Sequence, residues 1–172
     1  PKLEALPENV LPIMAYSLSK TYTLYGTRCG AMICIAKTKE IADEFKRVCE
    51  YSSRGSWSNS AKVAQVILSR IYGEPGLLER VDKERAHYRE MLIKRGRAFE
   101  EEAKKVGLKI VPFDAGFFIS IPCSDPDAIS AKLEKEGVFI VPLAKGLRVS
   151  VASISEDKCR KLPAIIKAAM EE

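Results

Sequence analysis

Histidine is almost absent from this sequence, and catalytic triads built on histidine are nearly excluded with it. The one histidine, His87, lies in a stretch dense in charged residues, where a surface position on a helix is expected. A catalytic triad with histidine as the base is therefore not expected. The five cysteines show no Cys-x-x-Cys spacing, which argues against a metal site and against disulfides. We expect buried free thiols and a reducing, cytoplasmic location.

Long hydrophobic runs are also missing. The best apolar stretches, residues 31–36 and 116–122, are much shorter than the roughly 20 residues that cross a bilayer. No signal-peptide pattern opens the chain. The net charge of +5 could attract nucleic acid, but along residues 77–105 lysine and arginine alternate with glutamate, as on a solvated helix face. We therefore expect neither a membrane nor a nucleic-acid partner.

An initiating methionine is absent as well, and the chain opens at Pro1. We therefore expect part of a longer protein. A length of 172 residues suffices for one domain or for parts of two. The Gly-Glu-Pro-Gly stretch at residues 73–76 is the best candidate for a boundary. It predicts two domain parts, residues 1–74 and 75–172.

Short apolar runs and capping residues predict the elements of the first part, which resembles the end of a larger α/β domain. Two buried strands are expected on either side of a loop that contains Lys20. Two helices follow, the first capped by Thr38 and the second by Ser58 or Asn59. "RGSW", residues 54–57, predicts the turn between them. The expected ranges are 11–18 and 29–36 for the strands and 38–52 and 61–73 for the helices.

The second part is predicted to be a compact α+β unit, with helices on one face of a mixed sheet. A long amphipathic helix ends at Gly107, and the last helix begins at Ser155. Two apolar runs around Asp114 and Gly116 predict a hairpin. The expected ranges are 77–105, 125–137 and 155–172 for the helices and 108–113, 116–122, 138–143 and 146–153 for the strands.

The stretch "AYSLSKTYTLYGTRCGAMI", residues 15–33, places serines, a lysine and an arginine between two apolar runs. A lysine attacks a carbonyl only as the neutral amine, so burial or a nearby cation must lower its pKa. Lys20 would lie at the partly desolvated end of a strand, and Arg28 would be the cation. Arg28 and the hydroxyls of Ser17 and Ser19 could bind phosphate oxygens. Such groups can hold a phosphorylated aldehyde as a Schiff base; the alternative is a surface loop with solvated charges.

The segment "SLSKTYTLYGTRCG", residues 17–30, resembles the pyridoxal-phosphate lysine motif of the class I aminotransferases of fold type I, the aspartate aminotransferase family. The resemblance implies that Lys20 forms the Schiff base with pyridoxal 5'-phosphate. It also implies that Ser17 and Arg28 bind the cofactor phosphate. Ser19 and Tyr25 match the motif too, and we assign them lesser roles.

Two further matches extend the resemblance over nearly the whole chain. "GLRVSVAS" resembles the strand whose arginine binds the substrate α-carboxylate, which is Arg148 here. An arginine in so apolar a strand is costly without a partner, which favours a ligand role. "RGSWSN" resembles the loop whose arginine reaches the neighbouring subunit's active site and, in the aspartate enzymes, binds the distal carboxylate; here it would be Arg54. A structural turn arginine paired with a glutamate is an equally open reading of Arg54.

The loop around Arg54 departs from the family pattern. The family often has prolines after the Ser-Asn pair, where this chain has Ser60 and Ala61. Gly55 and Trp57 also differ from the commonest loop. Acidic and aromatic amino acids therefore both stay open as substrates, because Trp57 would add stacking surface, together with Tyr51.

The resemblance implies an α/β fold made of the C-terminal end of the large domain and the small α+β domain. In that family, the aspartate that pairs with the pyridine nitrogen precedes the lysine by more residues than this chain has ahead of Lys20. We expect transfer of an amino group from an amino acid to a 2-oxo acid, a homodimer in the full-length protein, and an isolated chain that is inactive or nearly so. A pyridoxal-phosphate lyase of the same fold, an aminotransferase-like domain of a transcriptional regulator and a structural fragment remain open.

Overall fold

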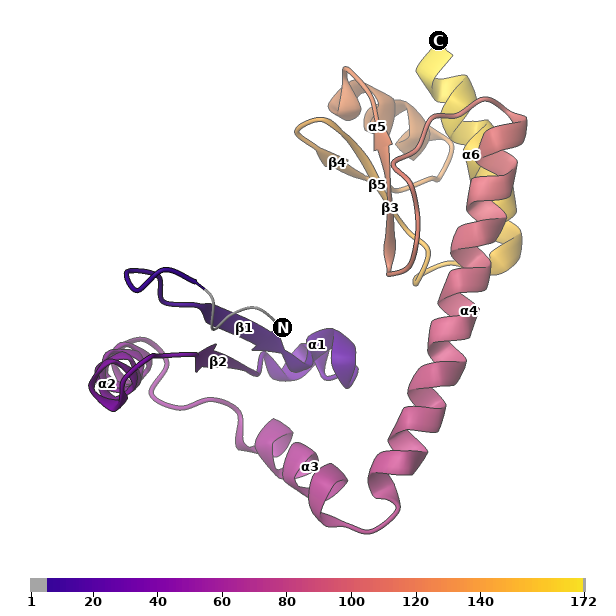
Figure 1. Ribbon diagram of the computed structural model, residues 1–172. Helices are drawn as coiled ribbons and strands as arrows, with labels where there is room; N and C mark the ends of the chain where they lie inside the picture. The colour runs from indigo at the N-terminus through magenta and orange to yellow at the C-terminus, as the bar shows by residue number, and fades with distance from the viewer. Residues whose placement is uncertain (1–5, 172) are drawn as a thin grey trace. The chain divides into compact units, whose positions relative to one another are not determined.

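The computed structural model describes residues 6–171 and divides the chain into two compact units. Unit 1 is Pro1–Leu78 and unit 2 is Glu79–Glu172, and each is described by itself. The division lies close to the Gly-Glu-Pro-Gly stretch at which the sequence predicts a boundary. The helices and strands of both units are labelled in Figure 1.

Unit 1 begins with an antiparallel pair of strands, β1 (Ile13–Ser17) and β2 (Gly30–Cys34), in which Ser17 faces Gly30. A Cβ at Gly30 would collide with the carbonyl oxygen of Tyr16, so the strands meet closely only with glycine there. Both strands lie where the sequence predicts them.

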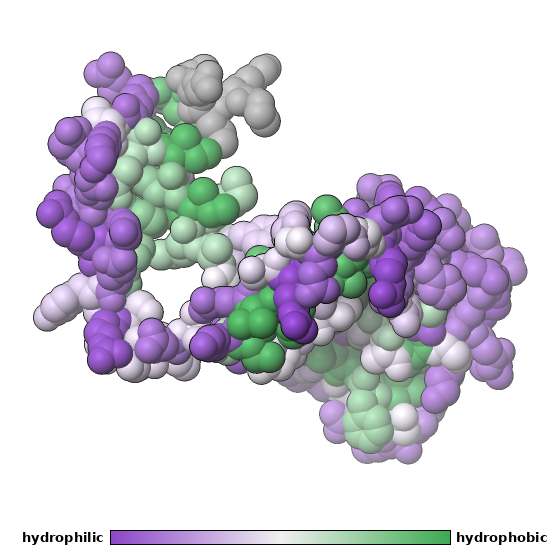
Figure 2. All heavy atoms as spheres, turned by 90° about the horizontal axis from the view of Figure 1, so that it is seen from below, coloured by the Kyte–Doolittle hydropathy of each residue, from purple (hydrophilic) through white to green (hydrophobic). Residues whose placement is uncertain are grey.

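The expected burial of these strands is wrong for the described residues: β1 is exposed throughout, and β2 is exposed except for a half-buried Cys34. Two strands cover each other only at their hydrogen-bonded edges, and their faces stay in water unless another layer packs on them. Figure 2 shows hydrophobic surface on this unit beside the hydrophilic surface of the helix that follows.

Two longer helices follow the strands in unit 1, α2 (Lys39–Ser56) and α3 (Lys62–Gly73). Thr38 caps α2 as predicted, since its side chain accepts a hydrogen bond from the Ile41 amide at 3.4 Å. The predicted turn at 54–57 is wrong, because α2 continues through Gly55. Glycine destabilises a helix by only about 1 kcal/mol relative to alanine, and the backbone hydrogen bonds at the end of the helix offset this cost.

The predicted caps of α3 are also wrong. The N-cap is Ala61, and it makes no side-chain hydrogen bond to the helix. The chain turns before α3 instead, where Ser58 adopts a φ of +68° and donates its amide to the Ser53 carbonyl at 3.0 Å. Serine and asparagine favour such turns as strongly as they favour caps, so the sequence does not separate the two.

Unit 2 combines three helices with a three-stranded antiparallel sheet of order β3-β5-β4 (Figure 1). The expectation of a mixed sheet is therefore wrong. The long helix α4 and the positive φ of Gly107 agree with the sequence, and Ser155 caps the last helix through a 3.4 Å bond from the Lys158 amide. The elements are α4 (Leu77–Lys105), β3 (Phe118–Pro122), α5 (Pro126–Lys135), β4 (Val141–Leu143), β5 (Gly146–Ser150) and α6 (Glu156–Glu171).

The predicted hairpin between residues 108–113 and 116–122 is wrong as well. Residues 108–113 form no strand, and one hydrogen bond, from the Val111 amide to the Ser120 carbonyl at 2.9 Å, joins the two runs. Pro112 has no amide hydrogen to donate, which interrupts a ladder there. The second run instead pairs with β5, in register from Phe118 opposite Ser150 to Pro122 opposite Gly146.

The core of unit 2 lies between the sheet and the helices. Because side chains alternate along a strand, Leu147 and Val149 of β5 face this core while Arg148 faces the other side. Alternation therefore decides where the predicted substrate arginine points. The fully buried side chains of this core include Phe99, Ile119, Ile121, Leu133, Leu147 and Ile166.

Ion pairs hold α4 and α6 together. Lys94 contacts Glu156 at 3.1 Å, and Arg160 contacts Glu101 at 3.2 Å and Glu102 at 3.6 Å. Hydrogen bonds from Arg160 and then Lys94 lower the pKa of Glu156 below its ordinary value of 4.5. A hydrogen bond from Lys105 is the main cause of a lowered pKa at Glu102. The charged residues of these helices therefore serve partly to join them.

Candidate functional site

Lys20 lies in the short helix α1 (Leu18–Thr21), which directly follows β1, and Ser17 is its N-cap. The Ser17 hydroxyl accepts a hydrogen bond from the Ser19 amide at 3.2 Å. The sequence predicts a loop and a partly desolvated lysine here, and both expectations are wrong for the described chain. The serine favours a helix start rather than a loop, and the helical turn leaves Lys20 exposed.

The aromatic ring of Tyr25 brings Lys20 and Arg28 together. The Lys20 Nζ lies 4.7 Å from the ring centroid, and the Arg28 guanidinium carbon lies 4.9 Å from it. Arg28 has a left-handed backbone, with φ +49°, and its Nη1 donates to the Tyr25 carbonyl at 3.3 Å. Two cations that repel each other share one electron-rich ring, which partly offsets the repulsion. Tyr25 is thus more central than the sequence suggests.

Buried residues support this segment from beneath. Leu18, Tyr22 and Cys29 are buried, and the Leu18 amide donates to the Cys29 carbonyl at 3.2 Å. The hydroxyls of Tyr22 and Tyr72 are hydrogen-bonded at 2.7 Å, which ties the segment to α3. The predicted cofactor groups therefore face outward from a fixed base. A guanidinium and an amine on one ring, with a serine at the start of the helix that contains the amine, suit a phosphorylated carbonyl compound.

Arg54 lies in the last turn of α2 rather than in a loop. Its Nη1 donates to the Ser58 hydroxyl at 2.7 Å, so the glutamate partner that the sequence left open is not the contact observed. Tyr51 and Trp57, the proposed stacking residues, are 85% and 82% exposed. The α2 end therefore presents a guanidinium beside free aromatic surface.

Arg148 lies in β5 of unit 2, half-buried, with its guanidinium carbon 4.6 Å from the centroid of the Phe118 ring. Its Nε atom is buried and has no hydrogen-bond partner among the described residues. The sequence points to Arg148 but gives no sign of this aromatic contact, because pairing of β3 with β5 is what creates it.

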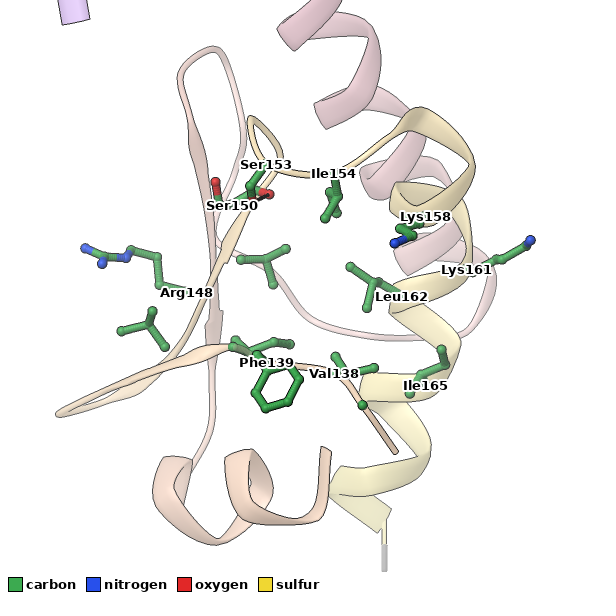
Figure 3. Close-up of a pocket in the computed structure, with 14 residues that line it drawn as sticks. Val138, Phe139, Arg148, Ser150, Ser153, Ile154, Lys158, Lys161, Leu162 and Ile165 are labelled. Carbon is green, nitrogen blue, oxygen red and sulfur yellow. Dashed lines mark hydrogen bonds between the residues drawn. The ribbon is translucent and has the colours of Figure 1, made fainter. Parts of the chain in front are cut away.

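A cavity of about 540 Å³ lies in unit 2 between the segment around Phe139 and helix α6. Figure 3 shows Leu162 and Ile165 lining its α6 side, while the Arg148 side chain extends away from them. Arg148, the predicted carboxylate-binding residue, is therefore one of the residues that line this cavity, on the side opposite α6.

The described residues 6–171 contain no cluster of three or more side chains suited to a metal ion. No helix in that part of the chain is long and apolar enough to cross a membrane. The cysteines are free thiols, but the expected burial applies only to Cys29 and Cys159. Burial raises the pKa of the Cys159 thiol.

Comparison with known proteins completes the description of the site. An aminotransferase structure from Anaerococcus prevotii DSM 20548 is 35% identical and superposes with a TM-score of 0.91 over 97% of this chain and 41% of that chain. The structure of an aromatic-amino-acid aminotransferase from Burkholderia pseudomallei, covalently bound to pyridoxal phosphate, is 21% identical, with a TM-score of 0.72 over 94% of this chain and 41% of that one. These matches confirm the expected fold class.

A curated aromatic amino acid aminotransferase from Cutibacterium acnes is 28% identical over 156 residues, which are 90% of this chain and 40% of that protein. The chain therefore spans about 40% of the length of this relative. The profile of the family described as Aminotransferase class I and II matches residues 2–166, so the chain belongs to that family.

Proposed function

We propose that this chain supplies the cofactor-binding lysine and the substrate-carboxylate arginine of a pyridoxal-phosphate-dependent aminotransferase. The observation that carries the proposal is the contact of Lys20 and Arg28 with one ring, that of Tyr25, while Ser17 caps the helix that contains Lys20, in a member of this family. The substrates would be an amino acid and a 2-oxo acid. Aromatic and acidic amino acids are the proposed classes, and the exposed Trp57 and Tyr51 support the aromatic one.

The residues present fit the cofactor. The Ser17 hydroxyl accepts one hydrogen bond and keeps its own hydrogen to donate to a phosphate oxygen. Arg28 uses Nη1 for one bond to its own turn, which leaves further guanidinium donors for the same phosphate. Lys20 is exposed beside them and can reach a bound aldehyde. Pyridoxal phosphate, when bound, would supply an electron sink for the bond broken at the substrate's α-carbon.

The roles of the side chains follow from their chemistry. The Lys20 Nζ would hold the cofactor; once displaced by the amine of the substrate, it would take the α-proton as a free amine and later return it as a general acid. Arg28 and Ser17 keep the phosphate in place. Arg148 binds the α-carboxylate through its planar donors and so fixes the orientation of the substrate.

We also propose a homodimer of the full-length protein, in which Arg54 reaches the neighbouring subunit's site and binds the distal group of the substrate. Exposed apolar side chains on α2 and at its end, Val48, Tyr51 and Trp57, support the proposal. Aromatic residues are enriched at protein interfaces, where a partner covers their apolar surface. Free cysteines agree with the proposed cytoplasmic location.

Reductive trapping tests the cofactor role. The 172-residue chain, and a version extended to the full length of its relatives, are incubated with pyridoxal phosphate, reduced with borohydride, digested and mapped by mass. We expect the label on Lys20 in the extended protein, and we expect added inorganic phosphate to reduce labelling by competing for Arg28 and Ser17.

Matched variants make the result specific. Lys20→Ala should abolish the labelled peptide, whereas Lys39→Ala, which removes an exposed lysine of α2, should leave it unchanged. A label spread evenly over surface lysines in a folded extended protein would overturn the cofactor role. Amine transfer to 2-oxo acids then separates an aminotransferase from a lyase of the same fold.

A further inference from the structure

We propose that Phe118 is a positioning residue that orients Arg148 for binding a carboxylate. The proposal rests on the proposed role of Arg148 and adds the residue that makes this role possible. Phe118 would touch the arginine rather than the substrate. Its ring would hold the guanidinium with one face covered, so that the outer edge of the plane stays free for the two oxygens of a carboxylate.

The strand register places the two side chains together. Ser120 lies opposite Arg148 across the β3-β5 pair, and Phe118 lies two residues before Ser120, on the same face. Phe118 is therefore the diagonal neighbour of Arg148, within reach of a long side chain. The separation of 4.6 Å between the guanidinium carbon and the ring centroid lies well within the range of a cation–π contact.

Phe118 does not serve the core of unit 2. Its ring is 42% exposed, whereas its neighbour Ile119, which points to the other face of β3, is 1% exposed. An aromatic residue with 42% of its surface in contact with water lies outside the core, so core packing does not by itself explain its position. The contact with Arg148 does explain it.

The ring is also the main described contact that can fix the guanidinium. The structure gives the Nε atom no hydrogen-bond partner among the described residues, although that atom is buried. An arginine loses much rotational freedom when it is held in one orientation. If the side chain were not already ordered, this loss of entropy would weaken the binding of a carboxylate. Stacking on Phe118 orders the side chain before the ligand arrives, while the Nη atoms keep their donors.

Titration of the chain with a carboxylate, followed at the Arg148 side chain, tests the proposal. The 172-residue chain with ¹⁵N-labelled arginine is titrated with 3-phenylpropionate, and the Nε–Hε resonance of Arg148, assigned with Arg148→Lys, is followed by NMR. This hydrogen is buried, which slows its exchange with water. We expect Phe118→Leu to weaken binding about threefold to tenfold, because leucine keeps apolar bulk but has no ring face.

The conservative variant separates positioning from folding. Phe118→Tyr keeps the ring face and should bind within about twofold of the parent chain. The backbone amide spectra of β3 and β5 must be unchanged in both variants; if leucine disturbs them, Phe118→Met provides the second ringless side chain.

Each outcome of the titration supports or overturns the positioning role of Phe118. Binding that weakens with leucine and recovers with tyrosine supports the proposal. Equal binding by all three proteins overturns it while the carboxylate role of Arg148 stands, and so does equal weakening by tyrosine and leucine. A parent chain whose Arg148 resonance does not respond to the ligand removes the carboxylate role itself, and the positioning role with it.

Discussion

At the scale of single residues, aromatic rings contact three of the cations to which we assign functional roles. Tyr25 contacts Lys20 and Arg28 in unit 1, and Phe118 contacts Arg148 in unit 2. Arg28 and Arg148 have proposed roles in binding an anion, and Lys20 has a proposed role in holding the cofactor. A ring attracts a cation without competing for its hydrogen-bond donors, whereas a carboxylate partner would occupy them. Aromatic contacts are therefore compatible with a site that must stay ready for an anionic ligand.

A prediction at this scale concerns Tyr25. Tyr25→Leu should weaken binding of pyridoxal phosphate about threefold to tenfold, because Lys20 and Arg28 lose the ring that holds them together. Tyr25→Phe, which keeps the ring, should bind nearly as the parent does. Borohydride-trapped cofactor at Lys20, measured against cofactor concentration, gives both affinities. If leucine and phenylalanine give the same affinity, the ring contact has no part in binding.

At the scale of elements, helix α4 packs against the segment before β3 at a point where no side chain fits. Gly96 lies on this helix, and a Cβ there would overlap the ring of Phe113. Phe113 is itself buried, and its carbonyl accepts a bond from Arg97 at 3.0 Å, which limits its ability to move aside. Close packing thus requires a glycine in the middle of a helix, against local propensity.

Gly96→Ala should therefore destabilise unit 2. Overpacking costs about 1–3 kcal/mol, which exceeds the gain of up to about 1 kcal/mol in helix propensity. We expect a lower midpoint of thermal unfolding by circular dichroism. The matched control is Gly73→Ala in α3, where a Cβ meets no atom within 4 Å, so that the variant should be neutral or more stable. A Gly96→Ala protein as stable as the control would show that Phe113 relaxes freely.

The ion pairs between α4 and α6 predict a dependence on pH. The pKa of Glu156 and that of Glu102 are below 4.5 in the folded chain, so their contribution is fully present above about pH 4.5 and is lost as pH falls through the lowered values. Arg160→Gln removes a shared partner and should flatten the decline of the unfolding midpoint between about pH 4.5 and pH 3. Parallel curves for the two proteins would contradict this account.

At the scale of the whole molecule, the two units differ in how well their apolar residues are covered. Unit 2 has a continuous buried core, whereas β1 and β2 of unit 1 leave Ile13, Met14, Met32 and Ile33 exposed. Exposed apolar strands with open edges favour association with further polypeptide. The proposed function accordingly assigns the complete activity to a protein of its relatives' length.

The isolated chain should show no transamination, or almost none. The family resemblance implies that the aspartate for the pyridine nitrogen lies outside these residues, and without it charge on the α-carbon is poorly stabilised. Transfer of amine from aspartate or phenylalanine to a 2-oxo acid, with a coupled assay for the new amino acid, measures this directly. Turnover by the pure 172-residue chain, absent from Lys20→Ala, would overturn the expectation.

The sequence by itself determined the elements that local chemistry controls. Thr38 and Ser155 cap their helices, and Gly107 adopts the positive φ expected where a helix ends. It also indicated Lys20 and Arg28, because motif spacing is a property of the chain. It failed at residues 54–57 and 108–113, where a turn-like or apolar composition is compatible with more than one structure.

Only the tertiary structure decided which side chains meet. The contacts of Tyr25 with Lys20 and Arg28 depend on the turn of backbone at Arg28. The contact between Phe118 and Arg148 depends on the register of β3 against β5, across roughly 30 residues of intervening chain whose path no local pattern specifies. Hydrophobic alternation fixes the face on which a residue lies, but pairing of distant strands fixes its neighbour.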